Sequence, residues 1–215
     1  ALSGGHWFGT DDIGRDVLSR VVWGTHDPLL AGVAIGLLAG LLGGWADALI
    51  SSLTDAFLAC PFLILAIAPA AFLGPSLSKA MIAIGISATP IFVRLTRAQV
   101  INVKIEDYVE AARALGASPW RVALRHVLPN VTALLIVQST LAIAGAVIAE
   151  ASLSFLGLGQ QPPAPGWGSM LNTAKSFVDN APWMAIWPGL ATFGLLLAFN
   201  LLGDGLRDAL DPRQV

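Results

Sequence analysis

The segment "DYVEAARALGASPWRVALRHVLPN" (107–130) is polar and basic, although apolar runs lie close to it on both sides. Its first half carries one apolar stripe at the helical spacing i, i+3, i+4 and i+7, formed by Tyr108, Ala111, Ala112 and Leu115. Gly116 predicts a left-handed helix stop, and Ser118 followed by Pro119 predicts the start of a second helix. The segment is therefore a compact pair of helices placed between two membrane segments.

The ends of this helix pair are also marked in the sequence. Asp107, followed three residues later by Glu110, predicts a capping box at the first helix. Pro129 predicts the end of the second helix. The second helix carries its own apolar stripe, formed by Trp120, Ala123, Leu124 and Val127.

The composition indicates an integral membrane protein with an all-α, polytopic fold. Of the 215 residues, 55% are hydrophobic and only 12% are charged, and the mean hydropathy is +0.72. Soluble domains carry about 25% charged residues, twice this share. Five runs are candidates for membrane spans: Leu29–Ala48, Phe57–Leu73, Leu77–Val93, Val131–Ala149 and Met184–Leu202. The first is the weakest, because its core from Leu29 to Gly44 would extend only about 24 Å as a helix, against a hydrocarbon core of about 30 Å.

The placement of lysine and arginine predicts the orientation, because positively charged loops stay in the cytoplasm. Half of the twelve basic residues lie within 94–130, whereas 150–183 holds only Lys175. We therefore expect 94–130 and the C-terminus in the cytoplasm, and 1–28 and 150–183 outside. Five spans that end inside require an N-terminus outside, and a further span upstream of Ala1 would account for that.

The sequence carries none of the motifs that would indicate an enzyme. No lysine stands in the Gly-Lys-Ser/Thr arrangement of a phosphate-binding loop, so we expect the chain to bind no nucleotide itself. The single cysteine, Cys60, is expected to pack rather than react. The histidines are far apart in the sequence, and we expect no metal site. An acidic cluster at Asp11, Asp12 and Asp16 is read as a capped surface helix rather than a cation site.

Glycine recurs every fourth residue at Gly32, Gly36, Gly40 and Gly44, which predicts a small-residue ridge for close helix packing. Polar residues inside apolar runs are the usual markers of a substrate path. On that ground the candidates are Gln138, Ser139 and Asn200, although none of them specifies a substrate.

The helix pair has three competing interpretations. A solvated connector between spans explains its polarity but not its spaced apolar stripe. A DNA-binding helix-turn-helix is disfavoured because membrane spans tether both ends, so no nucleic-acid partner is expected. A docking element for a cytoplasmic partner fits best, since two alanines have small side chains and let one face of the helix fit closely into a groove.

The same segment resembles the EAA loop of ATP-binding-cassette importer permeases. Their pattern of EAA, three residues, glycine and a later Leu-Pro matches Glu110, Ala111, Ala112, Gly116 and the pair 128–129. Three further stretches resemble the C-type subunit of the dipeptide/oligopeptide/nickel branch: "HWFGTDDIGRDVLSRVVWG" (6–24), "EASLSFLGLGQQPPAPGWGSML" (150–171) and "NLLGDGLRDALDPR" (200–213).

The resemblance implies the transmembrane domain of a type I ABC importer over 29–215, of which this chain would lack the first of six family spans. The EAA helix would then act as a coupling helix through Tyr108, Glu110, Ala111, Ala112, Leu115 and Gly116. The implied partners are a homologous B-type permease, two ATPase subunits that bind ATP and Mg, an extracytoplasmic solute-binding protein and the lipid of a bacterial inner membrane. The expected cargo is a di- or oligopeptide; nickel or another small solute, and an ion-coupled secondary carrier, are the alternatives.

Overall fold

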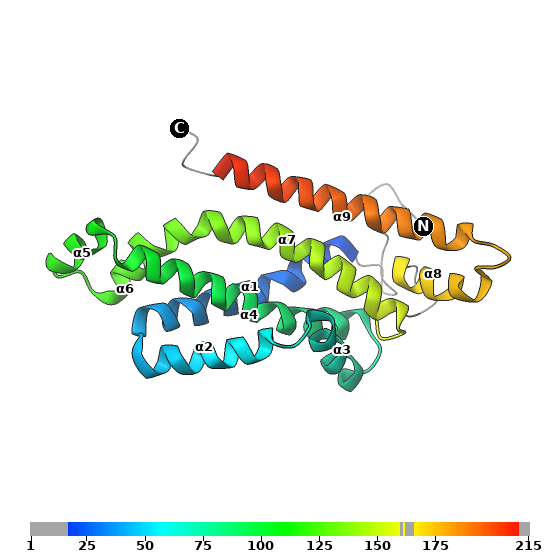
Figure 1. Cartoon of the computed structure of the whole chain (residues 1–215), viewed down its shortest axis with the longest axis horizontal. Helices are drawn as coiled ribbons and strands as arrows, with labels where there is room; N and C mark the ends of the chain where they lie inside the picture. The colour runs from blue at the N-terminus through cyan, green and yellow to red at the C-terminus, as the bar shows by residue number, and fades with distance from the viewer. Residues whose placement is uncertain (1–16, 160, 162–165, 211–215) are drawn as a thin grey trace.

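The computed structural model describes residues 17–159, 161 and 166–210, and within these ranges every regular element is a helix (Figure 1). The long helices run along the longest axis of the molecule, with α5 and α6 at one end and α8 at the other. The elements are α1 (Val17–Leu42), α2 (Gly44–Leu58), α3 (Phe62–Leu73), α4 (Leu77–Lys104), α5 (Asp107–Ala114), α6 (Pro119–Val122), a π turn η1 (Ala123–Val127), α7 (Leu128–Phe155), α8 (Trp167–Ala174), a 3-10 turn η2 (Lys175–Phe177) and α9 (Trp183–Leu210). The all-α prediction is confirmed.

Three of the described helical segments are long and apolar enough to cross a membrane: Leu77–Lys104, Pro119–Phe155 and Trp183–Ala209. A fourth span is obtained if the bent pair α2 and α3 counts as one, and α1 adds a shorter apolar stretch, Leu29–Leu42. The five predicted spans correspond to these five segments, but several of their predicted boundaries are wrong.

The first predicted span, Leu29–Ala48, is not one helix. Helix α1 already begins at Val17 and ends at Leu42, because Gly43 and Gly44 both take positive φ angles, of 64° and 60°. Its 26 residues extend about 39 Å, so the helix itself is not truncated. Polar residues before Leu29 interrupt the apolar pattern without ending the helix. The acidic cluster predicted at 11–16 lies outside the described residues.

The second predicted span, Phe57–Leu73, is broken near its start. Helix α2 ends at Leu58 and α3 begins at Phe62, with a bend of 88° between them. Pro61 is the N-cap of α3, and its missing N–H prevents it from continuing the hydrogen-bond ladder of α2. A proline inside an apolar run therefore divides one expected span into a bent pair.

Two other predicted ends lie inside helices. Helix α4 continues past Val93 to Lys104, so the basic residues expected in a loop begin on a helix. Pro129 does not end a helix either, since it stands in the first turn of α7, where a missing N–H is tolerated. The second helix of the predicted pair is thus the beginning of a continuous segment, Pro119–Phe155.

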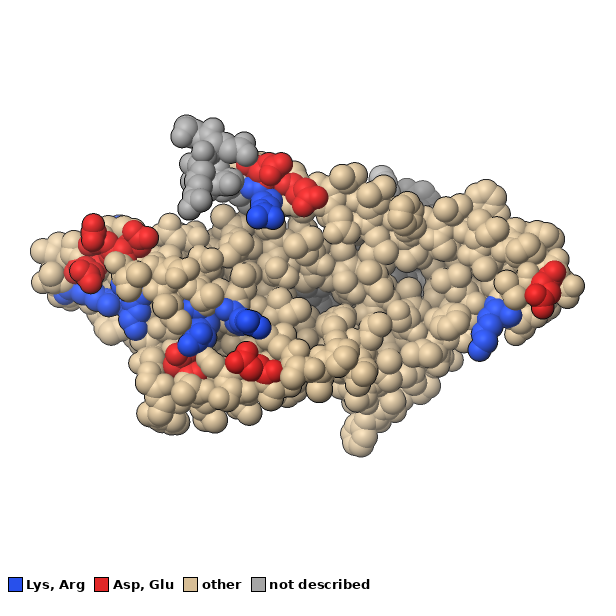
Figure 2. All heavy atoms as spheres, in the orientation of Figure 1, with Lys and Arg blue, Asp and Glu red and all other residues tan. Residues whose placement is uncertain are grey.

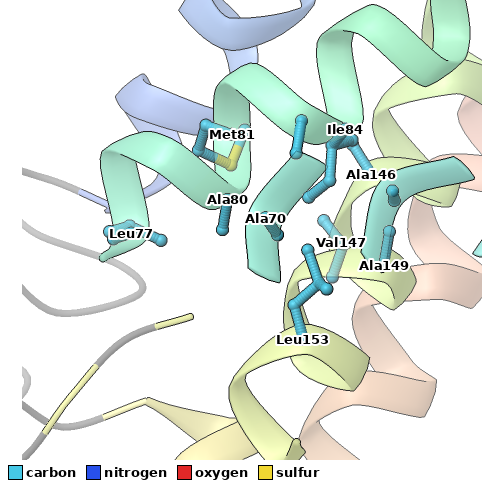
Figure 3. Packing of buried hydrophobic residues seen from close by; sticks show 11 residues of the cluster. Ala70, Leu77, Ala80, Met81, Ile84, Ala146, Val147, Ala149 and Leu153 are labelled. Carbon is cyan, nitrogen blue, oxygen red and sulfur yellow. The ribbon is translucent and has the colours of Figure 1, made fainter. Parts of the chain in front are cut away.

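The core is packed with small side chains. One cluster joins α3, α4 and α7, and Figure 3 shows side chains of all three helices gathered in it, among them Ala70, Ala80 and Ala146. Small side chains allow helix backbones to approach closely, which is how helices associate when lipid replaces water as the solvent. A second buried cluster lies nearer the α5–α6 end and includes Phe92 and Val100 of α4.

Helix α9 lies at the edge of the bundle, along α7 and α8, and most of its surface is exposed (Figure 1). It approaches α7 closely at Gly203, where an added Cβ would lie 2.8 Å from Thr140 Oγ1. Between Trp183 and Leu202, α9 exposes nine large apolar side chains: Trp183, Met184, Ile186, Trp187, Leu190, Phe193, Leu197, Leu201 and Leu202. Such a face is suited to lipid or to another membrane helix rather than to water.

Candidate functional site

The α5–α6 turn is built as the sequence predicts. Gly116 has φ of 83°, and the two hydrogen bonds of a Schellman motif are present, from Ala117 N to Ala112 O (3.0 Å) and from Gly116 N to Arg113 O (2.9 Å). Ser118 is then the N-cap of α6, and its hydroxyl accepts a hydrogen bond from the backbone N–H of Arg121 at 3.3 Å. The glycine stop and the serine cap are confirmed.

The predicted capping box is wrong. The N-cap of α5 is Glu106, whose side chain makes no capping hydrogen bond, and Asp107 is already the first helical residue. Asp107 and Glu110 still occupy the first turn, where negative charge is favoured by the positive end of the helix dipole. The acidic residues thus stabilise the helix start by charge rather than by a reciprocal pair of hydrogen bonds.

Helix α5 buries a residue that lies outside its predicted stripe. Val109 is fully buried and packs in the cluster that contains Val122, Val127 and Val131. The predicted stripe is left uncovered, with Leu115 89% exposed and Tyr108 45% exposed. One valine therefore anchors α5 to the bundle while its apolar stripe remains available.

Five large apolar side chains within 105–124 are exposed, and this set is called the α5–α6 patch: Ile105, Tyr108, Leu115, Trp120 and Leu124. Trp120 and Leu124 are each at least 60% exposed. On the face drawn in Figure 2, charged side chains lie over the half of the molecule that contains α5 and α6, and few lie between this half and the opposite end. A cluster of large apolar side chains within a charged end is typical of a surface that binds another protein.

The glycine ridge of α1 packs against α4. An added Cβ would lie 2.4 Å from Phe92 Cβ at Gly32, 2.7 Å from Thr96 Cβ at Gly36, and 2.6 Å from Val100 Cγ1 at Gly40. Glycines at every fourth position of α1 thus contact residues at every fourth position of α4. Because these glycines have no Cβ, the two helix backbones pack closer together than any larger residue would allow.

Gly44 does not belong to this ridge, which corrects its predicted packing role. Nothing lies within 4 Å of an added Cβ there, and its positive φ places it at the break between α1 and α2. The ridge ends because the helix that carries it ends.

Two of the three predicted substrate-path residues bond within their own helices. Ser139 Oγ donates to Leu135 O at 2.6 Å, and Asn200 Nδ2 donates to Leu196 O at 2.8 Å. Asn200 is exposed on α9, whereas Gln138 and Ser139 are half-buried on α7. Their role in a path stays a prediction.

An ion pair that sequence reasoning missed joins α2 to α4. The Arg97 guanidinium donates two hydrogen bonds to the Asp47 carboxylate, Nε to Oδ1 at 2.5 Å and an Nη to Oδ2 at 2.7 Å. Two turns further along α4, Lys104 Nζ donates to the carbonyl oxygens of Gly40 (3.3 Å) and Leu41 (3.2 Å), the last turn of α1. These contacts fasten α1 and α2 to α4, where helix-end carbonyls would otherwise lack donors.

The described residues hold no group of three or more His, Cys, Asp or Glu side chains arranged to bind a metal ion. Asp47 and Arg97 satisfy each other, and the α5–α6 patch presents apolar and not coordinating groups.

Known proteins resemble this chain along almost its whole length. The dipeptide transport system permease protein DppC of Alkalihalophilus pseudofirmus is 47% identical, over 97% of this chain and 72% of that protein. The glutathione transport system permease protein GsiD of Pectobacterium atrosepticum is 45% identical, over 98% of this chain and 74% of that protein.

Among solved structures, a chain of the MetNI methionine ABC transporter in an inward-facing form has the same fold, with a TM-score of 0.69 at 21% identity, covering 90% of this chain and 94% of that one. The model of the family described as "binding-protein-dependent transport system inner membrane component" matches residues 32–215. This multi-pass membrane chain therefore belongs to that family, the inner-membrane permease subunits of ABC importers.

Proposed function

We propose that this chain forms half of the translocation path of an ATP-driven importer and that α5 is its coupling helix. The observation that carries the proposal is the exposure of the apolar stripe on α5, while the buried side chain of Val109 packs the helix against the bundle. An exposed amphipathic helix of this kind fits a groove on a partner protein. The partner is an ATPase subunit, which binds the ATP and Mg that drive transport.

The sidedness of the chain follows from this assignment. The α5–α6 end and the C-terminus lie in the cytoplasm, and α8 with its flanking loops lies outside, where a solute-binding protein delivers the cargo. The exposed apolar face of α9 contacts lipid or the homologous permease subunit with which this chain pairs. Lysine and arginine, concentrated between Arg94 and Arg125, support this orientation.

The proposed cargo is a di- or oligopeptide. The names of the two relatives above refer to a dipeptide and to glutathione, which are both small peptides. Uptake of a labelled dipeptide by membrane vesicles with all subunits and internal ATP tests this class. Competition by unlabelled peptides but not by Ni²⁺ is the expected result, and the reverse pattern would assign the metal instead.

Docking of α5 is tested by a site-specific crosslink. Ala111 is exposed on α5, so Ala111→Cys, in a Cys60→Ser background because Cys60 is itself exposed, is expected to crosslink to the ATPase subunit. The yield is expected to change when ATP binds. The matched control is Val178→Cys, which is exposed at the opposite end of the bundle and should give no such product. Equal yields from both positions, or none from Ala111→Cys, would reduce the loop to a connector.

Reversing the charge of Glu110 tests the coupling role directly. Glu110 is exposed in the first turn of α5, so Glu110→Lys is expected to leave the complex assembled while uptake falls at least tenfold, because a buried charge contact across an interface is worth about 1.5–3 kcal/mol. Uptake and ATP hydrolysis are measured together in proteoliposomes. A bulky residue at Gly116 is a less selective probe, since any side chain is strained at φ of 83°. Uptake equal to that of the unmodified protein would reject the role of Glu110.

A further inference from the structure

The π turn η1 (Ala123–Val127) directly precedes α7. Within it, the backbone N–H of Leu128 donates to the carbonyl of Ala123, five residues back instead of four. The next residue is Pro129, which has no N–H to donate, so the regular ladder cannot be resumed at once. Single π turns inside long helices are rare and occur frequently at functional sites.

The side chain of Asn130, the residue after this proline, bonds both to the π turn and to α5. Its side-chain amide donates one hydrogen bond to the carbonyl of His126 at 2.7 Å, and a second to the hydroxyl of Tyr108 at 3.0 Å. Because an amide group has two N–H donors, one side chain can serve both acceptors. Asn130 thus connects the π turn to α5.

Tyr108 meets the same turn a second time through its ring. The centroids of the Tyr108 and His126 rings are 6.2 Å apart, at an interplanar angle of 51°. The neighbouring Val109 is buried beside Val127 of the π turn. Two consecutive residues of α5, one polar and one apolar, are therefore attached to one turn of the long α7 segment.

The N–H group at the end of the π turn has two carbonyl oxygens within one residue of each other as alternative acceptors. The N–H of Leu128 can bond to Ala123, as it does here, or to Leu124 if the segment returns to the α-helical ladder. A change between these registers rotates everything before the turn relative to α7. Energetic coupling between distant sites needs an element with two such discrete arrangements.

On the basis of the function proposed above, we propose that Tyr108 and Asn130 are positioning residues that link α5 to the π turn Ala123–Val127, so that movement of the coupling helix switches the register of that turn and reorients α7. The link is distinct from docking, because the link depends on the hydroxyl group of Tyr108, whereas docking depends on the apolar groups of the exposed stripe. Both contacts of Asn130 are solvent-exposed, so they set the coupling without deciding whether the chain folds.

The test uses the complete transporter in proteoliposomes, with solute transported per ATP hydrolysed as the readout. Tyr108→Phe keeps the ring but removes the hydroxyl, and Asn130→Leu removes both amide donors. Each is expected to lower this ratio about fivefold, the lower end of typical coupling between sites. The double variant is expected to lose no more than either single one, because both remove the same link.

Two controls separate the link from local structure. Thr132 Oγ1 bonds only to Leu128 O within α7, so Thr132→Val should leave the ratio unchanged. Asn130→Asp can accept a hydrogen bond from the Tyr108 hydroxyl, and it should retain more coupling than Asn130→Leu unless Tyr108→Phe is also present.

The crosslink from Ala111→Cys distinguishes this proposal from the function on which it rests. A retained crosslink with a lowered ratio supports the link. A retained crosslink with an unchanged ratio, or additive losses in the double variant, overturns the link and leaves docking intact. A crosslink lost in Tyr108→Phe would make Tyr108 a docking residue and also overturns the link. No crosslink from Ala111→Cys when Tyr108 and Asn130 are both unchanged would overturn the docking itself.

Discussion

Replacing Gly36 by alanine is expected to separate α1 from α4. The added Cβ would lie 2.7 Å from the Val93 carbonyl oxygen and 3.1 Å from the Arg97 nitrogen. Both are main-chain atoms of α4, so no side-chain rotation can relieve the clash, and the helices must move apart. Overpacking of this kind costs about 1–3 kcal/mol, and the thermal midpoint of the detergent-solubilised complex is expected to fall by several degrees.

The matched control is Gly194→Ala on α9. Nothing lies within 4 Å of an added Cβ there, and alanine is favoured over glycine in a helix by about 1 kcal/mol. The thermal midpoint of this variant should be equal or higher. A similar fall in both variants, or no fall for Gly36→Ala, would show that the ridge is not the contact that holds α1 in place.

The period of the ridge could be recognised in the sequence, but its partner could not. Gly32, Gly36 and Gly40 define one face of a helix, and a face does not say which of the other helices covers it. The partner positions on α4 are Phe92 and Val100, with a threonine between them, and no small-residue pattern marks them in advance. The choice depends on how the whole bundle is assembled.

The errors in the predicted ends of the spans share one cause. An apolar run indicates which residues suit the membrane interior, but it does not indicate where the helix begins or ends. Arg94 and Lys104 are polar and unsuited to lipid, yet α4 continues through both, since basic side chains are good helix formers. The opposite error occurred at Gly43 and Gly44, where an apolar run continues but the helix ends. The Gly-Gly pair was a breaker signal that the apolar composition obscured.

The helix pair was predicted more accurately because its signals are local. A glycine stop and a serine cap act within one turn of chain, and both form as expected at Gly116 and Ser118. Burial is not local: Val109 was not expected in the core because its neighbours in the buried cluster come from other segments, both before and after it in the chain. The apolar stripe was correctly identified as a surface, and its exposure is what a docking helix needs.

The ion pair between Asp47 and Arg97 could not be predicted, because 50 residues separate its members and no spacing rule connects them. Its geometry is nevertheless strong. A planar guanidinium and a carboxylate share two parallel hydrogen bonds, and the side chains are only 32% and 18% exposed. Asp47 also lies in the first turn of α2, where negative charge is favoured by the helix dipole.

Breaking this pair is expected to have the second large effect on stability. Arg97→Gln leaves a mostly buried carboxylate without its partner, at a cost of about 2–3 kcal/mol, and frees α2 from α4. Asp47→Asn should cost less stability, since the charge of Asp55 still attracts the Arg97 guanidinium. Thermal midpoints of the purified complex, measured for both single variants and the double variant, give the interaction energy of the pair.

The double variant decides whether the pair itself, and not a local change on one helix, accounts for the loss. With Asp47→Asn and Arg97→Gln combined, no unpartnered charge of this pair remains, so the loss should be clearly less than the sum of the single losses. Arg94→Gln is the matched control, because Arg94 is exposed on the same helix one turn away and should cost less than about 0.5 kcal/mol. Additive single losses, or a control as damaging as Arg97→Gln, would mean that the α2–α4 contact is held by apolar packing and that the ion pair contributes no net stability.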